Sequence, residues 1–283
     1  MPLIIDVLRL VRLHQWIKNA FVLAGLLFSG LWQEPQWQAA AMKAFFAFCC
    51  SASLIYIIND WHDREADARH PKKKSRPLAR NALPGWLVLA LAALLVAAAL
   101  ALAWGNGLLL AILAVYVALN LAYSRYLKHV PVVDVSIIAS GFMLRLLAGT
   151  VAIGIPPSNW MLLTGLFVAL LLGFAKRKAE SFHAEADRRA VMEHYPAALL
   201  DTYIAFAMTA TITTYALFAT SAQAQLQHGA RLVYTVPVVI FALLRFVYRL
   251  HQGHGEDVSK DLVRDPWIFT SIVLWLLIVV QGA

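Results

Sequence analysis

Residues 58–80 read INDWHDREADARHPKKKSRPLAR, and this charged segment directly follows a long apolar run. Its first half has Asn59, Asp60, Asp63 and Asp67 in the pattern N-D-x-x-D-x-x-x-D, and its second half is dense in Lys and Arg. If the apolar run continues as a helix, Asp63 lies about 60° and Asp67 about 20° around the axis from Asp60. All three carboxylates then share one helix face.

This carboxylate array offers the hard oxygen ligands that Mg²⁺ prefers. Magnesium usually takes one or two protein carboxylates, keeps several waters and binds substrate phosphates. Three neighbouring acids repel one another, which makes sense if a cation normally lies among them. We therefore expect Asp60, Asp63 and Asp67, together with Asn59, to hold Mg²⁺. The alternative explanation is a solvated loop with compensating charges.

Two bases that follow the acids are suited to phosphate. Arg76 can fork onto phosphate oxygens, and Lys73 adds a point charge on a flexible side chain. Together with the acids, they predict a binding site for a diphosphate and its metal ion. The alternative is that both belong to the general positive charge of the loop.

The composition indicates a membrane protein. Of the 283 residues, 61% are hydrophobic and 14% are charged, whereas soluble domains have about 25% charged residues. Nine apolar runs are each long enough for a hydrocarbon core of about 30 Å. We expect one all-α domain over residues 1–283, with residues 1–14 as an interfacial helix. The nine spans are expected at about 16–32, 38–58, 85–104, 107–124, 131–153, 159–175, 199–220, 232–250 and 267–282.

The positions of Lys and Arg predict the orientation. Basic residues crowd the N-terminus and four loops, near 59–84, 125–130, 176–198 and 251–266, and the alternate loops have almost none. The positive-inside rule places the N-terminus and the charged loops in the cytoplasm and the C-terminus outside. The net charge of +8 is thereby explained without a nucleic-acid partner. The expected location is a bacterial inner membrane, with the site on the cytoplasmic side.

The motif N-D-x-x-D-x-x-x-D followed by H-P-x-K-x-x-R-P resembles the UbiA-type intramembrane prenyltransferase superfamily. That resemblance implies nine transmembrane helices around a central cavity and Asp-rich cytoplasmic motifs that hold Mg²⁺ and diphosphate. Further segments are similar to one branch, the polyprenyl-phosphate phosphoribosyltransferases. These segments are RLHQWIKN at 12–19, YSRYLKHVPVVDV at 123–135, SGFMLRLLAG at 140–149, GFAKRKAE at 173–180, LLRFVY at 243–248 and LVRDP at 262–266.

One departure from the superfamily favours this branch. Users of prenyl diphosphates have a second motif, roughly D-x-x-x-D, after the sixth span, whereas this chain has Lys176, Arg177, Lys178 and Glu180. A cationic cluster suits an anionic second substrate. The implied reaction moves 5-phosphoribosyl from phosphoribosyl pyrophosphate to a polyprenyl phosphate. A second, smaller departure is Asn81, where a glycine is usual; Asn tolerates a left-handed turn.

The remaining candidate residues are polar groups at the predicted inner ends of spans. They are expected to bind substrate, with snorkelling anchors or structural pairs as the alternative explanation. Arg145 lies about 16 Å deeper than Asp134 on the same helix face, where a buried arginine marks a cavity or a partner. The predicted substrate-binding residues are Arg12, Gln15, Lys18, Asn59, Lys73, Arg76, Tyr123, Lys128, Asp134, Arg145, Lys176, Arg177 and Glu180.

Two other functions remain open at this point. The first is transfer of a polyprenyl group onto an aromatic or quinone acceptor, which the absent second Asp-rich motif argues against. The second is a transporter for a phosphorylated metabolite, which a mid-membrane Arg145 would suit. The sequence decides neither the prenyl chain length nor the pathway, and it is compatible with a homo-oligomer.

Overall fold

The computed structural model describes residues 3–71, 73–182, 190–254 and 264–282, and all regular secondary structure within them is helical. Seven helical segments there are long and apolar enough to cross a membrane. They are α3 (Pro35–Arg69), α4 (Gly85–Leu102), α5 (Gly107–Arg125), α6 (Val133–Ala152), α7 (Asn159–Glu180), α8 (Ala197–Thr220) and the segment Ala230–His251, which joins η6 (Ala230–Tyr234) to α10 (Thr235–His251).

The first and last predicted spans are not among the seven long segments, because neither forms a helix of 18 or more residues. The range 16–32 falls on a 3₁₀ helix, η1 (Leu13–Leu23), followed by α2 (Ala24–Phe28), and the last span is α12 (Pro266–Gly282), of 17 residues. A 3₁₀ helix rises about 2.0 Å per residue, so η1 and α2 together extend about 30 Å. Their length therefore suits a bilayer, and the count of nine spans stays a prediction.

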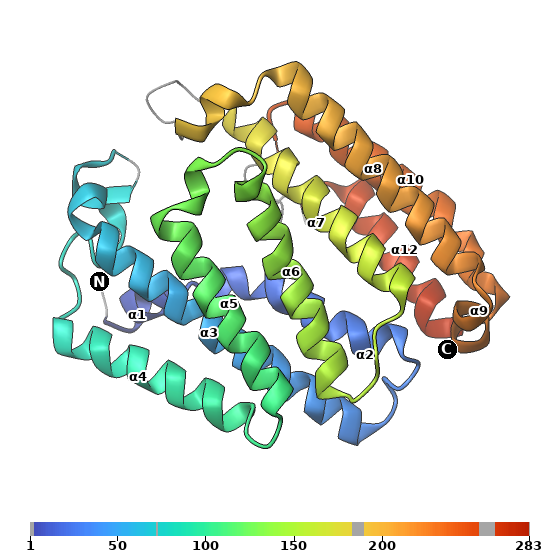
Figure 1. Cartoon of the computed structure of the whole chain (residues 1–283), viewed down its shortest axis with the longest axis horizontal. Helices are drawn as coiled ribbons and strands as arrows, with labels where there is room; N and C mark the ends of the chain where they lie inside the picture. The colour runs from blue at the N-terminus through green and yellow to red at the C-terminus, as the bar shows by residue number, and fades with distance from the viewer. Residues whose placement is uncertain (1–2, 72, 183–189, 255–263, 283) are drawn as a thin grey trace.

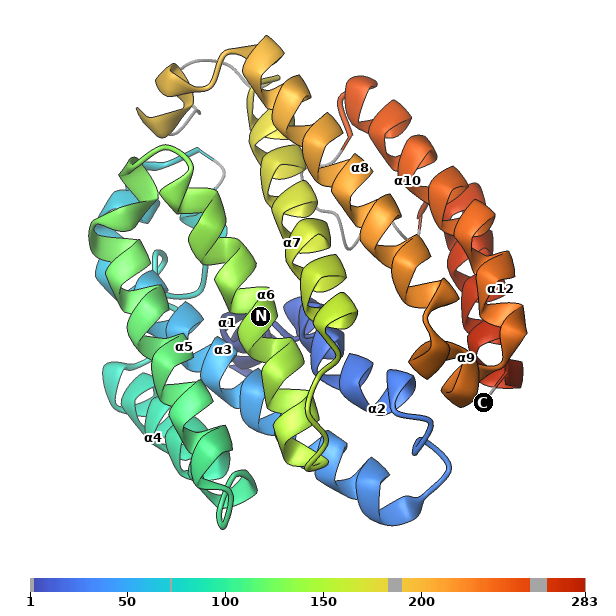
Figure 2. The same ribbon diagram turned by 45° about the vertical axis from the view of Figure 1, so that its right-hand side comes forward.

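Consecutive long helices run in opposite directions. The C-terminal ends of α3, α5, α7 and α10 lie toward one end of the molecule, and those of α4, α6 and α8 lie toward the other (Figures 1 and 2). The four basic loops predicted from the sequence leave the first of these ends. Side-chain caps begin two of the seven long segments: Asn106 accepts from the Leu109 amide before α5, and Ser158 accepts from the Met161 amide before α7.

Apolar clusters join the helices in two halves that share α6. One cluster packs η1, α3, α5 and α6 around Phe48 and Tyr116. Another packs α7, α8, α10 and α12 around Phe174 and Leu200, at the helix ends nearest the basic loops. At Gly149 of α6, a Cβ atom would lie 1.8 Å from the carbonyl oxygen of Val22. Only a glycine therefore allows η1 to lie this close to α6.

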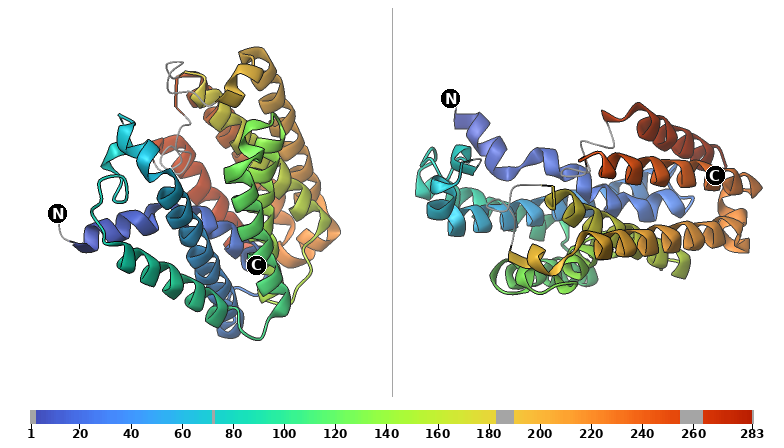
Figure 3. Two further views of the ribbon diagram at one scale, coloured as in Figure 1. Left: turned by 60° about the vertical axis from the view of Figure 1, so that its left-hand side comes forward. Right: turned by 90° about the horizontal axis from the view of Figure 1, so that it is seen from above.

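The N-terminal helix α1 (Leu3–Val11) lies at the edge of the molecule, beside α3 and α4 (Figure 3). Leu10 is buried against both helices, whereas Leu3, Ile4 and Leu8 are exposed. The buried carboxylate of Asp6 on α1 accepts a hydrogen bond from Arg80. This arrangement agrees with an amphipathic helix that lies along a membrane surface, which stays a prediction.

Candidate active site

Two buried carboxylates of α3 form the first part of the candidate site. Asp60 and Asp67 are each 3% exposed and lie two turns apart on the helix, which continues to Arg69 as the sequence predicted. The Nη1 atom of Arg76 donates to both, at 3.2 Å to Asp60 Oδ1 and 2.7 Å to Asp67 Oδ2. One cation therefore bridges the two carboxylates.

Two more cations complete this group. Arg12 Nη2 donates to Asp60 Oδ1 at 2.6 Å, and its guanidinium lies over the Tyr56 ring. The Lys73 ammonium lies 3.9 Å from Asp67 Oδ1. We call Arg12, Asp60, Asp67, Lys73 and Arg76 the Asp60–Asp67 cluster. The sequence predicted all five members as site residues.

The backbone explains how these five residues meet. α3 ends at His70, which has an extended backbone because Pro71 follows it. The chain then turns back through η2 (Lys73–Ser75) and places Arg76 against α3. Arg12 adopts a left-handed conformation, with φ 55°, between α1 and η1. Such a conformation is uncommon outside glycine and often occurs at functional sites.

The donor set of this cluster fits Mg²⁺. Magnesium usually takes one or two protein carboxylates and completes its shell with waters and substrate phosphates. Asp60 and Asp67, which both face the Arg76 guanidinium, offer such a pair. Within the described parts of the chain, no group of three or more His, Cys, Asp or Glu side chains is arranged to hold a metal ion. Asp63 and Asn59 are half-buried on α3, and their roles as ligands stay predictions.

The second part of the candidate site is more deeply buried. Asp134 at the start of α6 and Arg177 near the end of α7 are both 0% exposed. Arg177 Nε donates to Asp134 Oδ2 at 2.7 Å, Nη1 donates to Glu180 at 2.5 Å, and Nη2 donates to the Tyr123 hydroxyl at 3.2 Å. A fifth residue, Tyr195, donates to Asp134 Oδ1 at 2.7 Å. These five residues form the Asp134–Arg177 cluster.

A glycine allows this second cluster to form. A Cβ atom at Gly173 would lie 2.6 Å from Cγ1 of Val135, so α7 and α6 are in close contact at this level. Arg177 follows Gly173 by one helical turn, and Val135 is the neighbour of Asp134. The close approach therefore brings Arg177 onto Asp134. Its guanidinium faces protein carboxylates, which does not favour the direct phosphate contact expected from the sequence.

Tyr195 was not among the residues predicted from the sequence. It lies directly before Pro196, the N-cap residue of α8, and it is 61 residues from Asp134. No spacing rule connects positions that far apart. The available signal is a tyrosine in a predicted inner loop, which is too common to single out one residue.

Arg145 occupies a polar and aromatic environment in the middle of α6. It donates to Asn19 Oδ1 at 2.7 Å, to the Gly141 carbonyl at 2.8 Å and to the Tyr116 hydroxyl at 3.1 Å. Its guanidinium also lies 4.9 Å from the Phe48 ring centre. These contacts satisfy a buried cation and join η1, α5 and α6, so they favour the structural explanation over substrate binding.

The remaining predicted residues lie near these clusters in sequence, and all are half-buried. Gln15 and Lys18 are in η1, Lys128 is in the short 3₁₀ helix η3 (Leu127–His129), and Lys176 is in the last turns of α7. Each is accessible enough to meet a substrate. Their roles in binding stay predictions.

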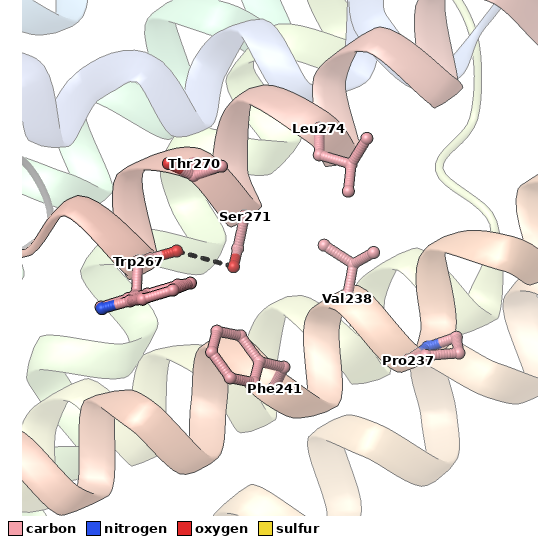
Figure 4. A pocket seen from close by; sticks show the side chains of 7 residues that line it. All are labelled: Pro237, Val238, Phe241, Trp267, Thr270, Ser271 and Leu274. Carbon is pink, nitrogen blue, oxygen red and sulfur yellow. Dashed lines mark hydrogen bonds between the residues drawn. The ribbon is translucent and has the colours of Figure 1, made fainter.

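A separate groove lies between α10 and α12 (Figure 4). It has a volume of about 340 Å³ and is lined mainly by apolar side chains, among them Val238, Phe241 and Leu274. Its lining also includes Trp267, Thr270 and Ser271, and the Ser271 hydroxyl donates to the carbonyl of Trp267. None of the predicted site residues lines it, so it is not the site of the carboxylate chemistry.

Comparisons with known proteins bear on this arrangement. The sequence model of the UbiA prenyltransferase family matches residues 19–277. A decaprenyl-phosphate phosphoribosyltransferase of Mycolicibacterium smegmatis is 36% identical, covering 97% of this chain and 91% of that protein. A protein of the same name from Corynebacterium glutamicum is 34% identical, covering 97% and 86%. The structure of a UbiA homologue from Archaeoglobus fulgidus bound to GPP and Mg²⁺ matches with a TM-score of 0.72 over 98% of both chains, at 17% identity, which shows a shared fold.

Proposed function

Because this chain belongs to the UbiA prenyltransferase family, we propose that it transfers 5-phosphoribosyl from phosphoribosyl pyrophosphate to a polyprenyl phosphate. The observation that carries the proposal is the likeness, over nearly the whole chain, to two proteins named decaprenyl-phosphate phosphoribosyltransferase. The sequence at the end of α7 supports the proposal. Users of prenyl diphosphates have a second Asp-rich motif at this place, whereas this chain has Arg177 paired with Glu180. The products are polyprenyl-phosphoryl-5-phosphoribose and pyrophosphate.

The reaction is a substitution at C1 of the ribose. The bond from C1 to the pyrophosphate oxygen breaks with its electron pair on the leaving group, and an oxygen of the lipid phosphate forms the new bond to C1. A phosphate nucleophile is largely ionised at neutral pH, so no dedicated general base is required. Catalysis then consists mainly of orienting the two anions and stabilising the charge that develops on pyrophosphate.

The Asp60–Asp67 cluster supplies the charge stabilisation in this proposal. Asp60 and Asp67, with Asp63 and Asn59 nearby on α3, would hold Mg²⁺, which neutralises the leaving pyrophosphate when bound. Arg76 and Lys73 are partly exposed, at 31% and 46% of their side chains, so they can turn from the carboxylates to pyrophosphate oxygens. Arg12 would keep Asp60 oriented during that exchange.

Three lysines outside the two clusters suit the second anion. Lys176 is half-buried beside the Asp134–Arg177 cluster, and Lys18 and Lys128 are accessible on η1 and η3. We assign these three lysines to the phosphate of the lipid acceptor or the 5-phosphate of the donor. Glu180, whose side chain is 14% exposed, can accept from a ribose hydroxyl.

The charge distribution supports a cytoplasmic site. Both clusters lie near the helix ends from which the basic loops leave, and the positive-inside rule places these loops in the cytoplasm. Phosphoribosyl pyrophosphate is a soluble polyanion, and a site on that side would receive it directly. The N-terminus is then cytoplasmic, and the C-terminus lies outside a bacterial inner membrane.

Transfer of label tests the proposal. Purified protein in detergent, with Mg²⁺, radiolabelled phosphoribosyl pyrophosphate and a polyprenyl phosphate, is expected to move label into the organic phase. Asp60→Asn and a chelator should each abolish the transfer. Arg64→Gln is the matched control, since Arg64 pairs with the exposed Glu65 on the same helix, and it should keep the activity. Label from a prenyl diphosphate appearing instead on an aromatic acceptor would replace the proposal with the prenyltransferase alternative.

A further inference from the structure

Each cluster of the candidate site has a residue with a strained backbone in it or next to it. Among the described residues, three other than glycine have positive φ: Arg12 at 55°, Asn81 at 52° and Val132 at 67°. Arg12 belongs to the Asp60–Asp67 cluster, and Val132 comes two residues before Asp134. For a β-branched residue such as valine a positive φ is a genuine outlier, and it persists only when surrounding contacts hold it.

One contact that holds Val132 is a buried hydroxyl. The amide of Val132 donates to the Tyr195 hydroxyl oxygen at 2.6 Å. Tyr195 is 4% exposed, whereas the Val132 side chain is largely in the open at 43% exposed. Burial of the valine side chain therefore does not explain its strained backbone. Two hydrogen bonds hold that backbone, one from its amide to Tyr195 and one from the Ser136 amide to its carbonyl at 2.8 Å, and the first of them comes from outside α6.

The same hydroxyl is also the first donor in a chain of hydrogen bonds. It donates to Asp134 Oδ1 at 2.7 Å, and the other oxygen of Asp134 accepts from Arg177, which in turn donates to Glu180. Burial, together with the hydrogen bond to Asp134, raises the pKa of Tyr195. The phenol consequently stays protonated, and its single proton remains available to Asp134.

We propose that Tyr195 is a positioning residue whose hydroxyl holds Val132 at positive φ and thereby fixes Asp134, Arg177 and Glu180 for the transfer reaction. The expected loss of kcat rests on the proposed function, whereas the expected loosening of the Val132 backbone does not. A displacement of about 1 Å at a reacting centre can cost about 100-fold in rate. Loss of one hydroxyl outside the reacting groups should therefore lower kcat.

The test compares Tyr195→Phe, Val132→Gly and the double variant with the parent. Tyr195→Phe is expected to lower kcat by about 10- to 100-fold. Hydrogen exchange of the 130–136 backbone should become faster in the same variant. Glycine adopts positive φ without a steric cost, so Val132→Gly alone should stay within about twofold of the parent. The double variant should recover part of the lost kcat, because the hydrogen bond from residue 195 to Asp134 stays absent. A tyrosine that only filled space would show no such rescue.

Tyr203→Phe is the matched control, because Tyr203 packs on Phe174 in the same apolar cluster as Tyr195. It should change neither kcat nor the exchange of residues 130–136. Unchanged exchange in Tyr195→Phe would overturn the proposal even if the parent proved to catalyse another reaction. Parent-like kcat in Tyr195→Phe, or a double variant no more active than Tyr195→Phe, would also overturn it.

Discussion

The two clusters of the candidate site use the same groups, carboxylates and arginines, in different surroundings. In the Asp60–Asp67 cluster the acids are buried, but their cations keep about a quarter to a half of their side-chain surface exposed. In the Asp134–Arg177 cluster the arginine is as completely buried as the aspartate that it contacts. In the proposed function, a metal ion or a substrate displaces the partly exposed cations from their carboxylates, whereas the buried Arg177 keeps its partners.

This difference separates binding from positioning. A buried pair of ions is costly to desolvate and strongly destabilising when one partner is removed, so its geometry is fixed in the folded protein. A pair whose cation is partly exposed costs less to break, since water solvates the cation that leaves. We therefore expect removal of a charged partner from the Asp134–Arg177 cluster to act mainly on stability, and substitutions in the Asp60–Asp67 cluster to act mainly on activity.

The largest effect is expected from Arg177→Met. It would leave Asp134 and Glu180 without their shared cation, at a cost of about 3–5 kcal/mol in the free energy of unfolding. Thermal unfolding in detergent measures this loss. The matched control is Arg245→Met, because Arg245 also donates to a buried aspartate, Asp265, but keeps 29% of its side chain exposed. If both variants lost the same stability, complete burial of the arginine would not be the cause.

An intermediate effect is expected from Asp67→Asn. The amide keeps the volume of the carboxylate but removes its charge, which should weaken Mg²⁺ binding and lower kcat by about 100-fold. The unfolding midpoint should fall by less than in Arg177→Met. Activity measured over a range of Mg²⁺ concentrations checks the prediction. A parent-like magnesium dependence would remove Asp67 from the metal site.

The smallest effect is expected from Lys73→Gln. Its ammonium lies 3.9 Å from Asp67 and is nearly half exposed, so the stability should change by less than about 0.5 kcal/mol. The loss of one charge near pyrophosphate should raise KM for phosphoribosyl pyrophosphate by roughly 10-fold, with kcat little changed. Steady-state kinetics separate the two parameters. A lower kcat at unchanged KM would instead place Lys73 at the transition state.

Local patterns in the sequence determined a large part of the fold and the part of the Asp60–Asp67 cluster that lies between Asp60 and Arg76. Apolar length predicted the seven long helices, because the thickness of a bilayer fixes how many residues a helix needs. The helical period placed Asp60 and Asp67 on one face of α3, and both are buried there. The nearby bases Lys73 and Arg76 follow along the same short segment, so their approach to α3 needed only a turn.

Contacts between distant helices were decided by the tertiary structure. Asp63 shares the helix of Asp60 and Asp67, yet the Arg76 bridge includes only the latter two. Arg177 looked like a phosphate ligand in the sequence, but close packing at Gly173 buries it against Asp134. The sequence by itself determined that acids and bases gather at one end of a helical membrane protein, because helical period and apolar length are local properties. Only the packing of α6 against α7, with Tyr195 from the segment before α8, decided which charges became fixed, because burial depends on residues far apart in the chain.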